Sequence, residues 1–201
     1  MRVLVVYESV LGNTRVIAEA VASGIRSTAP HAAVRCLPAS RVLAEPVEAD
    51  LVVVGGPTHF FGLPAERTRR IWVEGVLRRG RAEGATASLE PGAAGPGLRE
   101  WFEELAARPP GPPAAALAAA FDTRLGRTVS RGAARRIGQL LRRHGYRLIA
   151  RPRGFVVEDL TGPLRPGERD RAEAWGAQVA AVASWWLQED GDARWSSGRP
   201  A

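Results

Sequence analysis

The chain has no lysine and one cysteine among its 201 residues. Without lysine there is no Schiff-base chemistry and no Walker-type phosphate loop, which needs a lysine at the nucleotide phosphates. With Cys36 alone, an internal disulfide and a cysteine-built zinc site are excluded. The three histidines, His31, His59 and His144, are too scattered to resemble a ligand set, so no metal site is expected. Any redox chemistry would need a bound organic cofactor.

Long hydrophobic runs are also absent. No stretch approaches the roughly 18 consecutive apolar residues of a membrane span, and the N-terminal run "VLVVY" is too short for a signal-peptide core. We therefore expect a cytoplasmic protein without a membrane partner. The net charge of +7 comes entirely from arginine. These arginines are spread along the chain without any recognisable nucleic-acid-binding motif, so no nucleic-acid partner is expected.

Short apolar runs alternate with amphipathic stretches, which is typical of a doubly wound α/β domain. Strands are predicted over 2–7, 32–37, 50–56 and 114–123, with one interrupted last strand over 146–150 and 154–157, and helices over 13–27, 65–79, 98–108, 130–144 and 166–190. This order predicts a three-layer sandwich, with a five-stranded parallel sheet in the order 2-1-3-4-5 and helices on both faces. Residues 1–190 form one domain, with an exposed loop over 80–97 and a disordered tail over 191–201.

The loops that follow the first, third and fourth predicted strands should meet at one edge of this sheet. Ligands of doubly wound sheets bind at the carboxyl ends of the strands, where the strand order reverses. In the order 2-1-3-4-5 that point lies between the first and third strands. The loops 8–14, 57–63 and 121–127 are therefore expected to converge there.

The first loop, "ESVLGNT", leads directly into a predicted helix. The unpaired N–H groups and the dipole of a helix N-terminus favour an anion, and a phosphate monoester fits this setting. Ser9 and Thr14 supply hydroxyl groups, and Gly12 lets the backbone pass close to a ligand. The alternative is that the two hydroxyls only cap the helix and that Gly12 relieves a turn. The dinucleotide pattern G-x-G-x-x-G is absent.

The second loop, Pro57–Gly62, carries two adjacent phenylalanines, Phe60 and Phe61. Exposing both rings is unfavourable, so we expect them to cover either the core or a planar ligand, and one of them to be a core residue. His59 in the same loop is the one candidate for a catalytic group, because a neutral imidazole can donate to a ligand or substrate. The alternative is that it faces solvent.

The third loop, Phe121–Arg124, follows the fourth predicted strand. Its polar backbone and side-chain groups can meet the donors and acceptors of a heteroaromatic ring. The alternative is that Asp122 and Arg124 pair only with each other or with solvent.

Together, the motifs "VVYESVLGNTR", "DLVVVGGPTHFFGLP" and "AAAFDTR" resemble the flavodoxin-like family, and more narrowly bacterial flavodoxin-domain proteins with an E-S-x-x-G-N-T-R loop. The resemblance covers most of residues 1–188. It implies noncovalently bound FMN, with the phosphate in the first loop and the isoalloxazine ring between the other two. The implied cofactor-binding residues are Ser9, Val10, Leu11, Gly12, Asn13 and Thr14 at the phosphate, and Pro57, Thr58, His59, Phe60, Phe61, Gly62, Phe121, Asp122, Thr123 and Arg124 at the ring.

The role implied by this resemblance is electron transfer through FMN, to a redox partner protein or a small-molecule acceptor. Two alternatives stay open. One is an FMN-dependent NAD(P)H or quinone oxidoreductase, although no nicotinamide-binding motif is found. The other is a flavin-free binding or regulatory module, because Leu11 stands where the usual phosphate loop has threonine and no ring-stacking tyrosine has a counterpart. The sequence does not define the oligomeric state.

Overall fold

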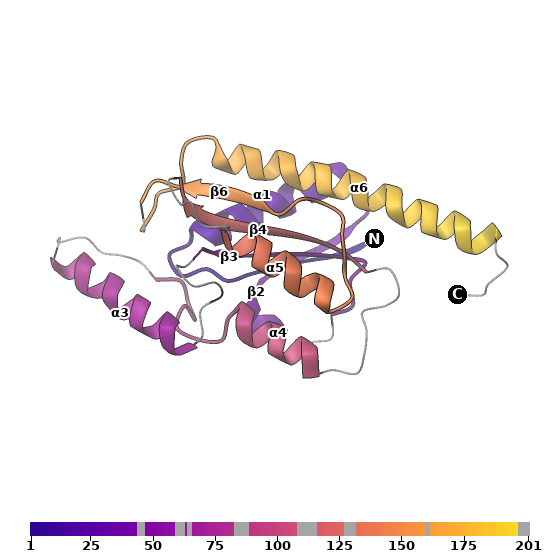
Figure 1. Ribbon diagram of the computed structural model, residues 1–201. Helices are drawn as coiled ribbons and strands as arrows, with labels where there is room; N and C mark the ends of the chain where they lie inside the picture. The colour runs from indigo at the N-terminus through magenta and orange to yellow at the C-terminus, as the bar shows by residue number, and fades with distance from the viewer. Residues whose placement is uncertain are drawn as a thin grey trace.

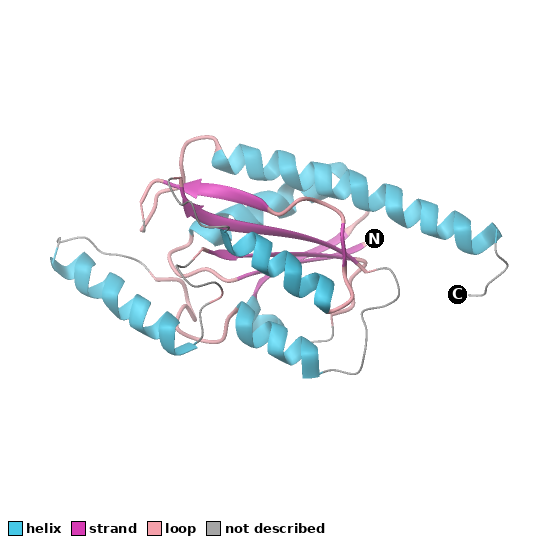
Figure 2. Cartoon of the chain, viewed as in Figure 1, coloured by secondary structure: helices cyan, strands magenta, loops and turns pink. Residues whose placement is uncertain are grey.

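A parallel sheet with helices on both faces organises the chain (Figures 1 and 2). The computed structural model describes residues 1–43, 47–58, 63, 66–82, 89–107, 116–126, 132–159 and 161–196. Its strands are β1 (Arg2–Tyr7), β2 (Ala33–Pro38), β3 (Leu51–Pro57), β4 (Leu117–Leu125), β5 (Arg147–Leu148) and β6 (Arg153–Val157). The order is β2-β1-β3-β4-β5, and β6 also pairs with β4. The predicted fold and strand order are confirmed, with β5 and β6 as the interrupted last strand.

Six helices accompany the sheet in the described part of the chain. They are α1 (Asn13–Thr28), α2 (Ala39–Val42), α3 (Glu66–Ala82), α4 (Leu98–Ala107), α5 (Gly132–Arg143) and α6 (Glu168–Ser196). Helices α1 and α6 cover one face of the sheet, and α4 and α5 cover the other (Figure 1). Helix α3 lies outside these layers, towards the end to which the strand arrows point. None of the described helices has the combination of length and apolar character that crossing a membrane requires.

The alternation of side chains along β1 explains why both faces of the sheet are covered. Val3 and Val5 belong to the core beneath α1 and α6, whereas Leu4 and Val6 belong to the core beneath α4 and α5. A strand buried on both faces needs apolar residues at every position, which is the pattern of "VLVV". The polar residues of this region are therefore confined to the ends of the strand.

Helices α1 and α6 approach each other closely because each carries a glycine at the contact. A Cβ atom on Gly24 would lie 1.9 Å from the carbonyl oxygen of Glu173, and one on Gly176 would lie 2.2 Å from the carbonyl oxygen of Val21. No side chain fits at either position. This contact fixes α6 along α1 and so closes one side of the sandwich.

Two predicted segments differ from the structure. Helix α6 continues to Ser196, so the first six residues of the predicted tail 191–201 are helical, and 197–201 lie outside the described residues. The sequence predicts an exposed loop over 80–97, but 80–82 belong to α3, and in 89–97 the side chain of Ala93 is buried. Alanine-, glycine- and proline-rich composition does not reveal such a contact, because small residues pack as readily as they are exposed.

Candidate functional site

The carboxyl ends of β1, β3 and β4 lie side by side, and the described residues at these ends contact one another. The hydroxyl oxygens of Thr14 and Thr123 lie 2.7 Å apart in a buried hydrogen bond. The backbone N–H of Thr58 donates to the carbonyl oxygen of Thr123 at 2.8 Å. One threonine at the end of β4 thus links the first and second loops.

The first loop ends in a left-handed turn that begins α1. Gly12 has φ of +86°, which glycine adopts without the strain of a side chain, and its N–H donates to the hydroxyl of Ser9 at 3.2 Å. Both predicted hydroxyl groups, those of Ser9 and Thr14, therefore bond within the protein. Among the described residues, the backbone N–H groups of Asn13, Thr14 and Arg15 meet no acceptor. The N-terminus of α1 thus keeps its donors available.

The side chain of Val10 turns towards α3, and the half-buried side chain of Leu11 packs beside it. Val10 is buried in a small cluster with Val73 of α3 and Ala93, and Leu11 packs against this cluster. Val10 therefore offers a ligand only its backbone groups, whereas part of the Leu11 side chain is exposed. The side-chain amide of Asn13 donates to the carbonyl oxygen of Thr161 at 3.5 Å.

The structure places Phe121 in the core rather than on a surface that a ligand contacts. Its side chain is fully buried and meets Phe155 and Trp175 edge-on, with ring centroids 6.2 Å apart in both pairs. A Cβ atom on Gly55 would lie 2.0 Å from this ring. The glycine in β3 therefore provides the room that the phenyl ring occupies.

Asp122 is a fully buried carboxylate beside the first turn of α5. Its Oδ2 accepts from the N–H of Ala134 at 2.9 Å, and Arg124 Nε lies 3.7 Å from Oδ1. Within the described part of the chain, Oδ1 has no hydrogen-bond partner. A Cβ atom on Gly132 would lie 2.3 Å from Oδ2, so only glycine fits there. Burial raises the pKa of Asp122, although the Ala134 N–H and Arg124 act in the opposite direction.

The second loop is described only at its start. Pro57 ends β3, and the hydroxyl of Thr58 accepts from the N–H of Ala133 at 2.9 Å. The predicted residues His59, Phe60, Phe61 and Gly62 lie outside the described residues. Thr58 and Asp122 together satisfy N–H groups at the start of α5, in contrast to the uncapped start of α1.

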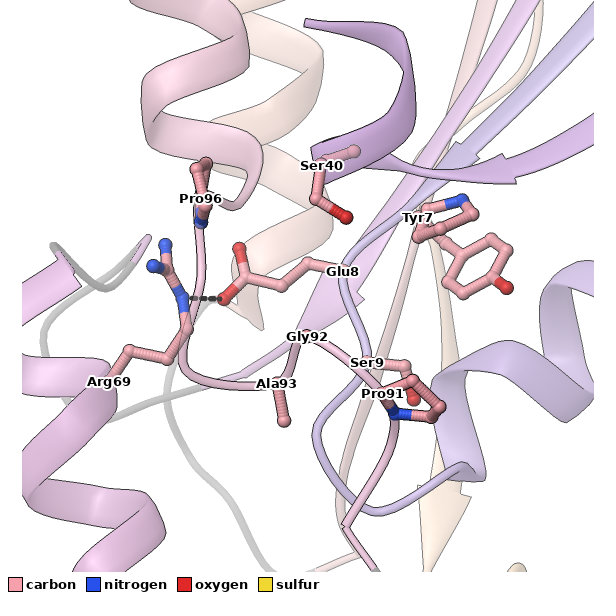
Figure 3. Close-up of a pocket in the computed structure, with 11 residues that line it drawn as sticks. Tyr7, Glu8, Ser9, Ser40, Arg69, Pro91, Gly92, Ala93 and Pro96 are labelled. Atoms are coloured by element: carbon pink, nitrogen blue, oxygen red, sulfur yellow. Dashed lines mark hydrogen bonds and ion pairs between the residues drawn. The ribbon is translucent and has the colours of Figure 1, made fainter.

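A buried ion-pair network, not predicted from the sequence, ties three elements together at the end of β1. Arg69 of α3 is 1% exposed and Glu8 is 5% exposed. Arg69 donates to Glu8 Oε1 and to Glu100 Oε2, both at 2.9 Å. The N–H of Leu98 donates to Glu8 Oε2 at 2.9 Å. Figure 3 shows the Glu8 and Arg69 side chains pointing towards each other across the gap between β1 and α3.

The charges in this network support one another. Burial lowers the pKa of Arg69, but the carboxylates of Glu8 and Glu100 raise it by more. The pKa of Arg69 therefore lies above its ordinary value. Burial also opposes the charge of Glu100, yet hydrogen bonds from the Gly97 N–H and from Arg69 lower its pKa. Glu8 directly follows an apolar strand, and this position in the sequence was enough to indicate a carboxylate at the sheet edge. Nothing in the sequence distinguishes Arg69 from its neighbour Arg70.

A small cavity borders this network, between the ends of β1 and β2 and the segment 91–96 (Figure 3). Its volume is about 20 Å³, which is enough for one water molecule and far too small for a flavin ring. Glu8, Ser9, Ser40 and Arg69 give it polar walls. We therefore assign it to solvent.

Neither a metal centre nor a reactive thiol is found in the described residues. No group of three or more His, Cys, Asp or Glu side chains there is placed to hold a metal ion. Cys36 is partly buried, and burial raises the pKa of its thiol to about 12, so the thiolate is not populated near neutral pH.

Comparisons with known proteins agree with this architecture. The flavodoxin family model matches residues 5–90, which include the first loop and β3. The chain has a flavodoxin-like fold. The predicted resemblance to flavodoxins is therefore confirmed, whereas the E-S-x-x-G-N-T-R phosphate loop and the roles of individual loop residues stay predictions.

Solved flavodoxins share the fold of this flavodoxin-like chain at low sequence identity. A flavodoxin from the domain Archaea is 20% identical with a TM-score of 0.57, and the match covers 92% of this chain and 99% of that one. Flavodoxin 1 from Bacillus cereus is 13% identical with a TM-score of 0.58, over 90% and 98% of the two chains. A Streptococcus pneumoniae flavodoxin is 16% identical with a TM-score of 0.55, over 90% and 99%. No curated protein sequence matches significantly.

Replacing Arg69 by methionine should lower the free energy of unfolding by roughly 3–5 kcal/mol, because the buried Glu8 carboxylate loses its cation. Arg70→Met is the matched control, since Arg70 is exposed and pairs with the likewise exposed Glu66 one turn away. We expect the control to change stability by less than about 0.5 kcal/mol. Urea unfolding of both variants measures the difference. Equal losses of stability in the Arg69 and Arg70 variants would contradict a special role for the buried Arg69–Glu8 pair.

Replacing Asp122 by asparagine should stabilise the protein at neutral pH. Because burial raises the pKa of Asp122 in the folded state, its ionisation removes stability as the pH rises from the unfolded pKa to the folded pKa. The asparagine oxygen can still accept from Ala134 N–H. Thermal unfolding across pH should show a gain for Asp122→Asn that shrinks below about pH 4. A variant less stable than wild type at neutral pH would refute this reasoning.

Proposed function

We propose that the chain binds FMN noncovalently and transfers electrons through it. The observation that carries the proposal is the set of available N–H groups at Asn13, Thr14 and Arg15, at the edge where the carboxyl ends of β1, β3 and β4 meet. A helix N-terminus with free donors favours an anion such as a phosphate monoester. The match of residues 5–90 to the flavodoxin family model supports the same assignment.

At the phosphate end, the backbone rather than the side chains supplies the hydrogen-bond donors. Leu11 supplies no hydroxyl, and those of Ser9 and Thr14 are bonded within the protein. The phosphate would therefore depend on backbone N–H groups, which bind anions well at the start of a helix.

The groups at the ring end also suit a flavin. A flavin ring presents both donors and acceptors. Thr58 and the partly exposed Arg124 lie at this edge of the sheet, where polar groups can meet those of the ring. Bound FMN supplies one- and two-electron transfer, while the protein holds and orients the cofactor. We extend the proposal to a cytoplasmic protein that exchanges electrons with a redox partner protein or a small acceptor.

A flavin-free regulatory or binding module is the second candidate. It is favoured by the burial of Val10 and the packing of Leu11 beneath α3, and by the engagement of both loop hydroxyls within the protein. An FMN-dependent NAD(P)H or quinone reductase is distinguished from a pure carrier by steady-state oxidation of NADPH with a quinone as the acceptor.

Leu11→Thr should increase the affinity for FMN by about tenfold, because it adds a hydroxyl donor beside the phosphate, and hydrogen bonds to charged groups stabilise by about 1.5–3 kcal/mol. Leu11→Val is the matched control, since valine has the shape of threonine without the hydroxyl. Quenching of flavin fluorescence measures the affinity, with riboflavin as the ligand that lacks phosphate.

Only the threonine variant should gain affinity, and only for FMN. Wild type that binds neither flavin would reject the proposal in favour of the flavin-free module. Equal affinity of wild type for FMN and riboflavin would show that this loop does not bind the phosphate.

A further inference from the structure

A carboxylate lies directly beside the first turn of α1. The segment 89–97 folds back onto the first loop, where the N–H of Glu90 donates to the carbonyl oxygen of Val10 at 2.9 Å. Glu90 Oε1 lies 3.0 Å from the position that a Cβ atom on Gly12 would take. The negative charge of Glu90 therefore sits next to the turn whose N–H groups are available.

Glu90 also holds the one arginine of this turn. Both of its carboxylate oxygens accept from Arg15 Nε at 3.0 Å. Arg15 donates in addition to Glu19 at 2.9 Å. Hydrogen bonds to Glu19 and Glu90 raise the pKa of Arg15 above its ordinary value. Two carboxylates thus surround a single cation, and their sum is a net negative charge.

The two carboxylates differ in how strongly they can affect an anion at the start of α1. The Glu90 side chain is 20% exposed, whereas that of Glu19 is 52% exposed. Solvent and salt screen an exposed charge more than a partly buried one. Glu19 also lies farther along α1, beyond the first turn, where the helix dipole has little effect. Glu90 is therefore the carboxylate with the larger influence.

We propose that Glu90 is a built-in anion that limits the affinity of this protein for a phosphate ligand. Its carboxylate lies beside the positive end of α1 and pairs with Arg15. A phosphate at the same turn therefore binds against a like charge. The inference rests on the proposed phosphate site. It adds that Glu90, a residue outside the loop motif, lowers the affinity of this site for its ligand.

The test compares Glu90→Gln with Glu19→Gln. Each variant removes one carboxylate that pairs with Arg15, but only Glu90 lies against Gly12. Glutamine keeps the size and an oxygen acceptor for Arg15, so the segment 89–97 should stay in place. The melting temperature confirms that both variants fold. Flavin fluorescence then gives the dissociation constants for FMN and for riboflavin at low and high salt.

Glu90→Gln should bind FMN about tenfold more tightly than wild type, because the negative charge beside the first turn of α1 is gone. Riboflavin binding should stay unchanged, and Glu19→Gln should change FMN binding by less than about twofold. The gain should diminish at high salt. Unchanged or weaker FMN binding by folded Glu90→Gln would overturn the inference and leave Glu90 as a structural clamp.

Failure of the proposed function is recognised separately. If wild type binds no flavin, the same two variants are compared by the rise in melting temperature that inorganic phosphate produces. A larger rise for Glu90→Gln than for Glu19→Gln supports the role of Glu90, and equal rises overturn it.

Discussion

The parallel pairing of β1, β3 and β4 places the ends of three distant segments at one edge of the sheet. Residues 8 and 58 directly follow β1 and β3, and residue 122 lies in the last half of β4, so three distant parts of the chain meet because these strands run in the same direction. The bodies of these strands are apolar on both faces, so polar groups collect where the strands end. The contacts of Thr123 with Thr14 and Thr58 are the direct result.

Buried charges at this edge are each matched by a specific partner. Glu8 is held by Arg69 and by the N–H of Leu98, which joins β1 to α3 and α4. Asp122 instead binds an N–H at the start of α5. Helix α1 is different, because its first N–H groups meet no acceptor in the described residues and the nearby charge of Glu90 is directed to Arg15. The start of α1 therefore keeps N–H donors that are not used within the described residues.

Much of the fold was predictable, because apolar runs and helical periodicity report burial directly. Residue roles were harder to predict. Phe121 looked like a ligand-facing aromatic, but strand alternation directs its ring into the core over Gly55. Arg69 was missed because its burial depends on the distant Glu8. Glu90 lies in a segment whose composition indicated only an exposed loop.

The position of the first loop at the sheet edge was predictable, whereas its inner contacts were not. Hydroxyl residues at Ser9 and Thr14 suggested side-chain donors for a phosphate. In the structure both hydroxyls bond within the protein, so the donors that remain belong to the backbone. Sequence motifs identify where a loop lies, but the distribution of its hydrogen bonds depends on neighbours from β4 and from segment 89–97.

The central claim is that the first turn of α1 binds the phosphate of a flavin. Backbone amide chemical shifts, followed by NMR during titration with FMN and with riboflavin, test it most directly. FMN should produce its largest shifts at the amides of Asn13, Thr14 and Arg15, and riboflavin should leave these three amides nearly unchanged. Saturable FMN binding that leaves these amides unmoved, or that moves them equally with riboflavin, would contradict the account.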